Sequence, residues 1–120
     1  MLLLDDDART LVITGPNAGG KSVAMKTVGL CAVMAACGLL LPAAPGTRVD
    51  FFDRLYADIG DAQSLDDDLS TFSSHVARLR QILKGAGPGT LVLLDEAGTG
   101  TGPAEGGALA QAVLERLTDA

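Results

Sequence analysis

The stretch that decides the fold of this chain is Gly15-Pro16-Asn17-Ala18-Gly19-Gly20-Lys21-Ser22. It matches the pattern of a glycine, four further residues and then Gly-Lys-Ser or Gly-Lys-Thr, which is typical of loops that bind nucleotide phosphates. Glycines in such a loop let backbone N–H groups surround the phosphates, and the N-terminus of the following helix adds positive potential. The alternative interpretation is a plain glycine-rich turn with a surface lysine.

The sequence on either side predicts that this loop connects a strand to a helix. Residues 9–14 are β-branched and apolar, which favours a short strand. Residues 21–37 are compatible with a helix and are apolar nearly all round, as in a helix enclosed between a sheet and other elements. We expect Cys31 and Cys37 to be reduced core residues of this helix, because their spacing turns them toward different faces.

The rest of the chain predicts a single α/β domain. The expected elements are one or two strands over residues 49–52 and 54–59, a loop over 60–68, a helix from about 70 to 84, a strand over 90–94 and a helix from Pro103 to about 117. This alternation predicts a sheet whose functional loops follow the C-terminal ends of the strands. A chain of 120 residues is long enough for one core.

Individual residues of the phosphate loop have separate predicted roles. Lys21 would reach the β- and γ-phosphates, and Ser22 would ligate Mg²⁺. The amide of Asn17 would reach the γ-phosphate or the attacking water. The predicted nucleotide-binding set is the contiguous run Gly15, Pro16, Asn17, Ala18, Gly19, Gly20, Lys21, Ser22 and Val23.

An acidic pair follows the predicted strand over residues 90–94. Asp95 comes directly after this strand, where a carboxylate beside a phosphate loop can hold the hydration shell of Mg²⁺. Glu96 is then positioned to polarise the attacking water as a general base. Any buried strand can end in acidic residues, so this interpretation depends on the complete phosphate loop in the same chain.

The charge balance limits what this chain can bind by itself. Nine Lys and Arg against 15 Asp and Glu give a net charge of −6, which disfavours a broad face for DNA or membranes. The N-terminal residues have no basic region followed by a long apolar stretch, so no signal peptide is predicted. The longest nearly apolar run, residues 28–41, is shorter than the roughly 18 residues that span a bilayer. We therefore expect a cytoplasmic protein without membrane contact.

Three segments together resemble the ATPase domain of MutS family proteins. They are the phosphate loop GPNAGGKS, ADIGDAQSLDDDLSTFSSH (residues 57–75) and LVLLDEAGTGTGP (residues 91–103). More narrowly, they resemble the second bacterial subfamily, which lacks the mismatch-reading domains. The resemblance implies an α/β fold, the ABC-type P-loop NTPase domain, which works as a homodimer. It also implies that residues 1–120 are a partial domain of this type, truncated at the C-terminal side, with the upstream clamp and lever and the downstream regions absent.

The resemblance also suggests roles for residues outside the phosphate loop. In the family, the segment that matches residues 70–73 reaches across the dimer to the γ-phosphate, which implies this contact for Ser70; an ordinary helix N-cap is the alternative. Asp61 and Gln63 lie where the family has a Q-loop-like coupling segment, with a solvated turn as the alternative. Residues 98–102 match a loop that lines the dimer interface, although Gly102 stands where the family usually has Asp. His75 does not replace the family's switch histidine and is expected to be structural.

The resemblance implies that this chain is the ATP-binding and hydrolysing core of a MutS-like protein, with ATP and Mg²⁺ as ligands. In the family, dimer closure acts on branched DNA, which restrains recombination, or on stalled ribosomes; the nucleic acid would be bound through regions outside this chain. One alternative is an ABC ATPase of another machine, which an LSGGQ-like signature would favour, whereas this chain has DLSTFSSH. Another is a catalytically inactive dimerisation or nucleotide-sensing module. We also expect the isolated chain to expose apolar faces and to self-associate.

Overall fold

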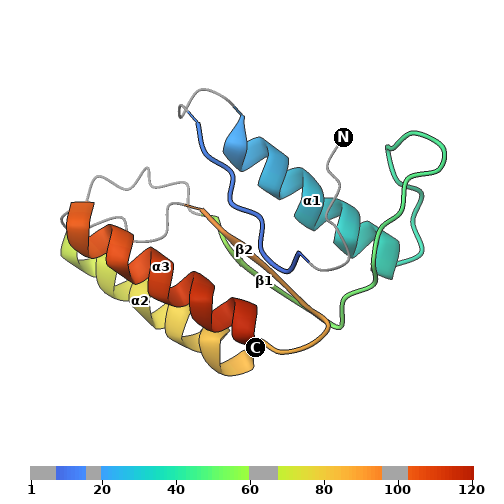
Figure 1. The fold of residues 1–120 in the computed structure, drawn as a ribbon. Coiled ribbons are helices and arrows are strands. Elements are labelled where there is room, and N and C mark those ends of the chain that lie inside the picture. Colours follow the sequence, from blue (N-terminus) through green and yellow to red (C-terminus); the bar gives the residue numbers. More distant parts are fainter. Residues whose placement is uncertain (1–7, 16–19, 60–67, 96–102) are drawn as a thin grey trace.

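The computed structural model describes residues 8–15, 20–59, 68–95 and 103–120. These residues form a small α/β arrangement of three helices and two parallel strands (Figure 1). In chain order the elements are α1 (Lys21–Ala36), β1 (Arg54–Asp58), α2 (Asp68–Gly85), β2 (Thr90–Leu94) and α3 (Pro103–Asp119).

The two strands pair in parallel, so both end at the same edge of the sheet. Arg54 lies opposite Thr90, and Asp58 lies opposite Leu94. Helix α2 makes the crossover that a parallel pair requires. The pairing continues one residue beyond β2, where the backbone N–H of Asp95 donates to the carbonyl oxygen of Asp58 (3.0 Å). Asp58 and Asp95 are therefore neighbours at the C-terminal edge of the sheet.

Helices lie on both sides of this sheet. α2 and α3 run next to each other on one side, and α1 lies on the other (Figure 1). Helix α1 approaches β2 closely at Gly29, where a Cβ atom would lie 2.7 Å from Cδ1 of Leu93. The buried apolar side chains of the described residues come from all three helices and from β2: Ala32, Leu79, Ile82, Leu93 and Val113.

The three predicted helices and two predicted strands are confirmed within a few residues. The helix expected over 21–37 ends at Ala36, with Cys37 as its C-cap. The helix expected over 70–84 begins at Asp68 and ends at Gly85, and the last helix extends to Asp119. The strand expected over 54–59 is β1, which ends at Asp58, and the strand expected over 90–94 is β2. Periodicity and the bounding Gly and Pro residues were sufficient for these elements.

The first predicted strand is wrong. Residues 9–14 form no strand, and Leu11, Val12 and Ile13 are exposed. A strand is stable only where a neighbour takes its backbone hydrogen bonds, and none of the described residues does so for this segment. β-branched composition alone therefore did not decide the local structure.

The predicted strand over residues 49–52 is also wrong, because the sheet begins later. Pairing starts at Asp53, whose N–H donates to the carbonyl oxygen of Gly89 (2.8 Å). Gly89 has a φ of +77° and turns the chain into β2. The partner strand thus begins at Thr90, and residues before Asp53 lie outside the ladder.

The prediction that α1 is enclosed is wrong as well. Only Gly29 and Ala32 of this helix are buried, while three large apolar side chains on it are about half exposed or more: Val23 (67%), Leu30 (60%) and Val33 (47%). One face of α1 packs on β2, and its opposite face is left open by the described elements. The predicted self-association of these apolar surfaces remains a prediction.

The cysteine prediction is half right. Cys31 and Cys37 are free thiols, as expected, but Cys31 is half-buried and Cys37 is exposed. Neither thiol is a core residue: Cys31 lies within α1, and Cys37 is the C-cap at the end of that helix. Within the described ranges, no helix is long and apolar enough to cross a membrane.

Candidate functional site

A hydrogen bond connects the start of α1 to the end of β2. The hydroxyl Oγ of Ser22 donates to Oδ2 of Asp95 over 2.5 Å, although the two residues are 73 positions apart. Both side chains are half-buried. Because Asp95 also pairs with Asp58 through its backbone, the ends of three elements (α1, β1 and β2) meet at one edge of the sheet.

The entry into α1 has a backbone geometry that favours glycine. Gly20, the N-cap, has φ 81° and ψ 20°, in the left-handed region that side chains disfavour. A Cβ atom at Gly20 would meet no other atom within 4 Å, so the requirement comes from the backbone and not from crowding. In this described part of the chain, no side chain caps the helix N-terminus and its first turn has no acidic residue. The first N–H groups of α1 therefore keep the positive potential of a helix N-terminus.

Lys21 brings a cation to the same place. Its Nζ donates to the carbonyl oxygen of Gly15 over 2.5 Å, so the ammonium group joins the two ends of the glycine-rich loop. The carbonyl is a neutral partner, and the charge of Lys21 remains available to an anion. A lysine and a free helix N-terminus together favour phosphate groups.

The donor groups at this edge fit a magnesium nucleotide. Mg²⁺ takes hard oxygen ligands, typically one or two protein groups together with phosphate oxygens and water. The hydroxyl of Ser22 and the carboxylate of Asp95 are such groups, and their contact places both at one point. Within the described residues, no cluster of three or more His, Cys, Asp or Glu could hold a metal ion by itself.

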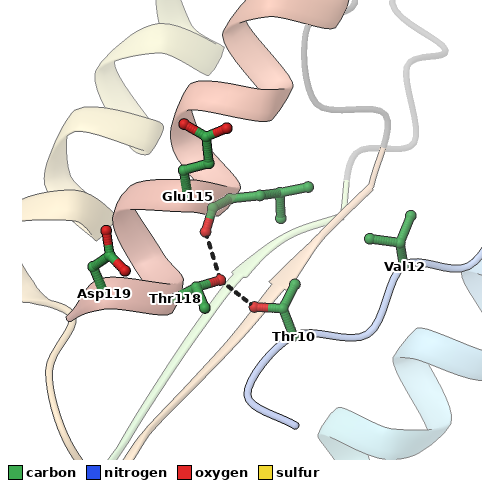
Figure 2. A pocket seen from close by; sticks show the side chains of 6 residues that line it. Thr10, Val12, Glu115, Thr118 and Asp119 are labelled. Carbon is green, nitrogen blue, oxygen red and sulfur yellow. Dashed lines mark hydrogen bonds between the residues drawn. The ribbon is translucent and has the colours of Figure 1, made fainter.

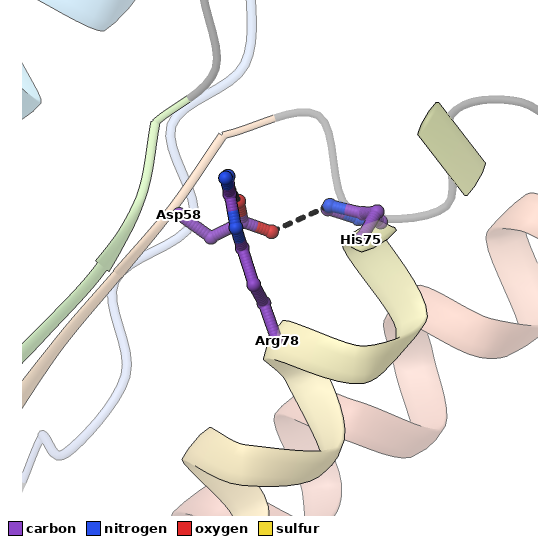
Figure 3. Close-up of polar contacts among 3 residues, drawn as sticks. All are labelled: Asp58, His75 and Arg78. Atoms are coloured by element: carbon purple, nitrogen blue, oxygen red, sulfur yellow. Dashed lines mark hydrogen bonds and ion pairs between the residues drawn. The ribbon is translucent and has the colours of Figure 1, made fainter. Parts of the chain in front are cut away.

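A second polar cluster lies one strand away, around Asp58 (Figure 3). The Asp58 side chain is only 3% exposed, and its Oδ1 accepts a hydrogen bond from Nη1 of Arg78 (3.2 Å). Nδ1 of His75 lies 2.5 Å from Oδ2 of the same carboxylate. Two successive turns of α2 are thus joined to the last residue of β1. The expectation that His75 is structural agrees with this contact.

The sequence analysis did not predict that Asp58 contacts His75 and Arg78. The available signal was an Asp at the end of a predicted strand and a His and an Arg three positions apart on the next helix. Residues three apart lie on the same helix face, so both could reach one carboxylate. The sequence pattern does not give the placement of the helix relative to the strand. That placement decides which carboxylate His75 and Arg78 contact.

A shallow hollow of about 370 Å³ lies elsewhere, between residues 10–12 and the end of α3 (Figure 2). Thr118 donates to the carbonyl oxygen of Leu114 (2.8 Å) and is 2.6 Å from Oγ1 of Thr10. Since the Thr118 proton is already used, Thr10 is the donor between the two hydroxyls. None of the residues predicted to bind a nucleotide lines this hollow, so it is not part of the site.

The family model described as MutS domain V matches residues 11–120 of this chain. The chain belongs to the MutS family. This result confirms, at the level of the family, the resemblance carried by the phosphate loop and by the segments over residues 57–75 and 91–103.

Curated relatives of this MutS-family chain are described as "Endonuclease MutS2". The protein of Pelotomaculum thermopropionicum is 57% identical over 117 residues, which cover 98% of this chain and 15% of that protein. The protein of Thermomicrobium roseum is 56% identical over 116 residues, with 97% and 15% covered. The protein of Staphylococcus carnosus is 52% identical over 112 residues, with 93% and 14% covered. The chain thus spans about 15% of the length of these relatives.

The structure describes part of the predicted site of this MutS-family chain. The predicted residues at the sheet edge are Gly15, Gly20, Lys21, Ser22 and Asp95. Val23 follows them in α1 and is exposed. Ser70 lies in the first turn of α2, where only the backbone is described. Outside the described residues lie Pro16, Asn17, Ala18, Gly19, Asp61, Gln63, Glu96 and residues 98–102, and their predicted roles remain predictions.

Proposed function

We propose that this chain is the ATP-binding and hydrolysing core of a MutS-like protein, most like the second bacterial subfamily and with an ABC-type P-loop NTPase fold. The observation that carries the proposal is the 2.5 Å hydrogen bond between Ser22 and Asp95. It joins the serine of a phosphate-loop sequence to the acidic residue after a strand, and these are the residue types that such sites use for Mg²⁺. Membership of the MutS family and the similarity to MutS2 proteins support the same function.

Binding of the triphosphate is assigned to the loop over residues 15–22 and to α1. Backbone N–H groups of the loop and of the first turn of α1 donate to phosphate oxygens, and Lys21 pairs with the β- and γ-phosphates. Nζ of Lys21 already lies at the loop, bound to Gly15, so ATP exchanges a neutral carbonyl partner for charged oxygens. Ser22 and Asp95 would hold Mg²⁺, whose chemistry when bound is to neutralise charge on the phosphates.

Hydrolysis is assigned to residues around the γ-phosphate. Glu96 accepts a proton from the attacking water while the water oxygen forms a bond to the γ-phosphorus and the bond to the bridging oxygen breaks. Asn17 orients the water or the γ-phosphate. Ser70, from the first turn of α2 of a second subunit, donates to the γ-phosphate, so the active unit is a homodimer.

The larger assembly is proposed to act on nucleic acid. A net charge of −6 argues against broad DNA contact by this chain, so branched DNA or a ribosome would be bound through other regions. The word endonuclease in the relatives' names describes proteins of which this chain spans about 15%. We assign no nuclease activity to residues 1–120 and propose a cytoplasmic location.

Titration of ATP with and without Mg²⁺ tests the binding step. Lys21→Ala should weaken ATP binding about tenfold or more, because a charged partner of the phosphates is lost. Lys84→Ala is the matched control, since it removes the same charge from an exposed position at the end of α2. Equal ATP affinity in the Lys21→Ala and Lys84→Ala proteins would contradict the proposal. Binding without turnover would instead favour a nucleotide-sensing module.

Mixing two inactive variants tests the contribution of Ser70 across the dimer. A mixed dimer of Lys21→Ala and Ser70→Ala subunits contains one site in which the loop and the serine are both intact. Random association of equal amounts should therefore restore about a quarter of the sites. Mixtures that are as inactive as the separate variants would rule out a contact in trans.

A further inference from the structure

Asp58 connects the sheet edge to α2 by two separate routes. Its backbone carbonyl oxygen accepts the N–H of Asp95 (3.0 Å), the residue whose carboxylate binds Ser22. Its side chain, 97% removed from solvent, contacts His75 and Arg78 (Figure 3). One residue therefore contacts both the strand end that is proposed to bind Mg²⁺ and the helix that contains Ser70.

His75 is the first described side chain of α2 that packs against the sheet. Side chains of this helix are described from Ser73 onward, and between residues 73 and 78 only His75 is not exposed. The described apolar anchors begin later, at Leu79 and Ile82, each 3% exposed. Over the described part of its N-terminal half, α2 is thus held to the sheet by the contact between His75 and Asp58.

The His75 ring has one polar partner among the described residues. Nδ1 faces Oδ2 of Asp58 at 2.5 Å as an ion pair, and Oδ2 has no hydrogen-bond partner among the described residues. Nε2 is buried and has no hydrogen-bond partner among the described residues. A buried polar ring with one partner depends on that partner. Loss of Asp58 or of the ring would therefore remove the contact that the described side chains make between this part of the helix and the sheet.

We propose that Asp58 and His75 are positioning residues for ATP turnover, which hold the N-terminal half of α2 (residues 68–75) at the sheet edge beside Asp95. This inference rests on the proposed function, in which Ser70 acts from that half of the helix. His75 lies little more than one turn after Ser70, about 7.5 Å along the axis. Without the anchor, the first turns shift while Leu79 and Ile82 still hold the second half. A shift of about 1 Å in a positioned group lowers a rate by about 100-fold.

The test compares variants of the intact protein in three measurements: ATP affinity by titration of a fluorescent ATP analogue with Mg²⁺, kcat by phosphate release, and amide hydrogen exchange. His75→Ala should leave ATP affinity within about twofold and lower kcat about tenfold or more. Exchange should accelerate over residues 68–75 and stay unchanged over 79–85, because only the first half of the helix loses its anchor.

Three further variants separate positioning from general destabilisation. His75→Asn keeps a donor near the position of Nδ1 and should recover most of kcat. Asp58→Asn should lower kcat without His75 being changed. Arg78→Ala is the matched control: Arg78 contacts the same carboxylate but is 63% exposed, so kcat should stay within about twofold.

The outcomes separate this inference from the proposed function. Unchanged kcat in His75→Ala, in a protein whose unsubstituted form hydrolyses ATP, would overturn the positioning role alone. A fall in kcat with an equal loss of ATP affinity and faster exchange along the whole chain would identify general destabilisation and also overturn it. Absence of ATP turnover in the unsubstituted protein would overturn both the inference and the proposed function.

Discussion

The hydrogen bond between Ser22 and Asp95 should contribute measurably to the stability of the sheet edge. Its length is 2.5 Å and both side chains are half-buried. A hydrogen bond to an ionised carboxylate contributes about 1.5–3 kcal/mol, and partial exposure favours the lower end. In a double-mutant cycle of Ser22→Ala and Asp95→Ala we therefore expect a coupling free energy of about 1.5 kcal/mol.

Urea unfolding without nucleotide measures this coupling. With a slope of about 1.5 kcal/mol/M, each single variant should move the unfolding midpoint by about 1 M. The control cycle pairs Thr27→Ala with Asp95→Ala, because the Thr27 hydroxyl bonds within α1 to the carbonyl oxygen of Val23 (2.8 Å). That cycle should be additive within about 0.5 kcal/mol. If the Ser22 and Asp95 effects were equally additive, the hydrogen bond would not join α1 to the sheet edge.

Three other substitutions have expected outcomes. Gly29→Ala should be less stable to urea than Gly107→Ala by about 1–3 kcal/mol, because a Cβ atom at Gly29 meets buried Leu93 while one at Gly107 meets open space. Equal stability of the two variants would contradict the close approach of α1 to β2. Gly20→Ala should lower the free energy of unfolding by about 1–2 kcal/mol, since φ is 81° there, and Gly87→Ala, with neither positive φ nor a close neighbour, should not reproduce this loss. Glu96→Gln should bind ATP normally and lower kcat about 100-fold or more, and a Glu96→Gln protein with normal turnover would remove the general-base role.

Local sequence patterns were sufficient to predict the elements whose own residues show a helical period or a continuous apolar run. Helices α2 and α3 have amphipathic periodicity, and β2 is a continuous apolar run bounded by Gly89 and Asp95. The strand expected over residues 9–14 failed because a strand depends on a partner elsewhere in the chain. The enclosed position expected for α1 failed because composition does not reveal how many elements cover a helix. Burial there reaches only Gly29 and Ala32.

Local sequence patterns also indicated part of the candidate site, but not its tertiary contacts. The phosphate-loop pattern and the acidic end of β2 predicted that Ser22 and Asp95 hold the same Mg²⁺; their side chains are in contact, and the metal role stays a prediction. The contact of Asp58 with His75 was missed because it depends on where α2 packs against the sheet. The spacing in the sequence shows that His75 and Arg78 lie on the same helix face. It does not show which carboxylate of the sheet they contact.

The measurement that tests the central claim most directly is Mg²⁺-dependent ATP turnover across a range of protein concentrations, with Lys21→Ala as the control. Turnover per subunit should rise with concentration, because the proposed active site is completed by a second subunit, and it should be lost in Lys21→Ala. Turnover that is absent at all concentrations, or that Lys21→Ala retains in full, would contradict the assignment of this chain as an ATP-hydrolysing core.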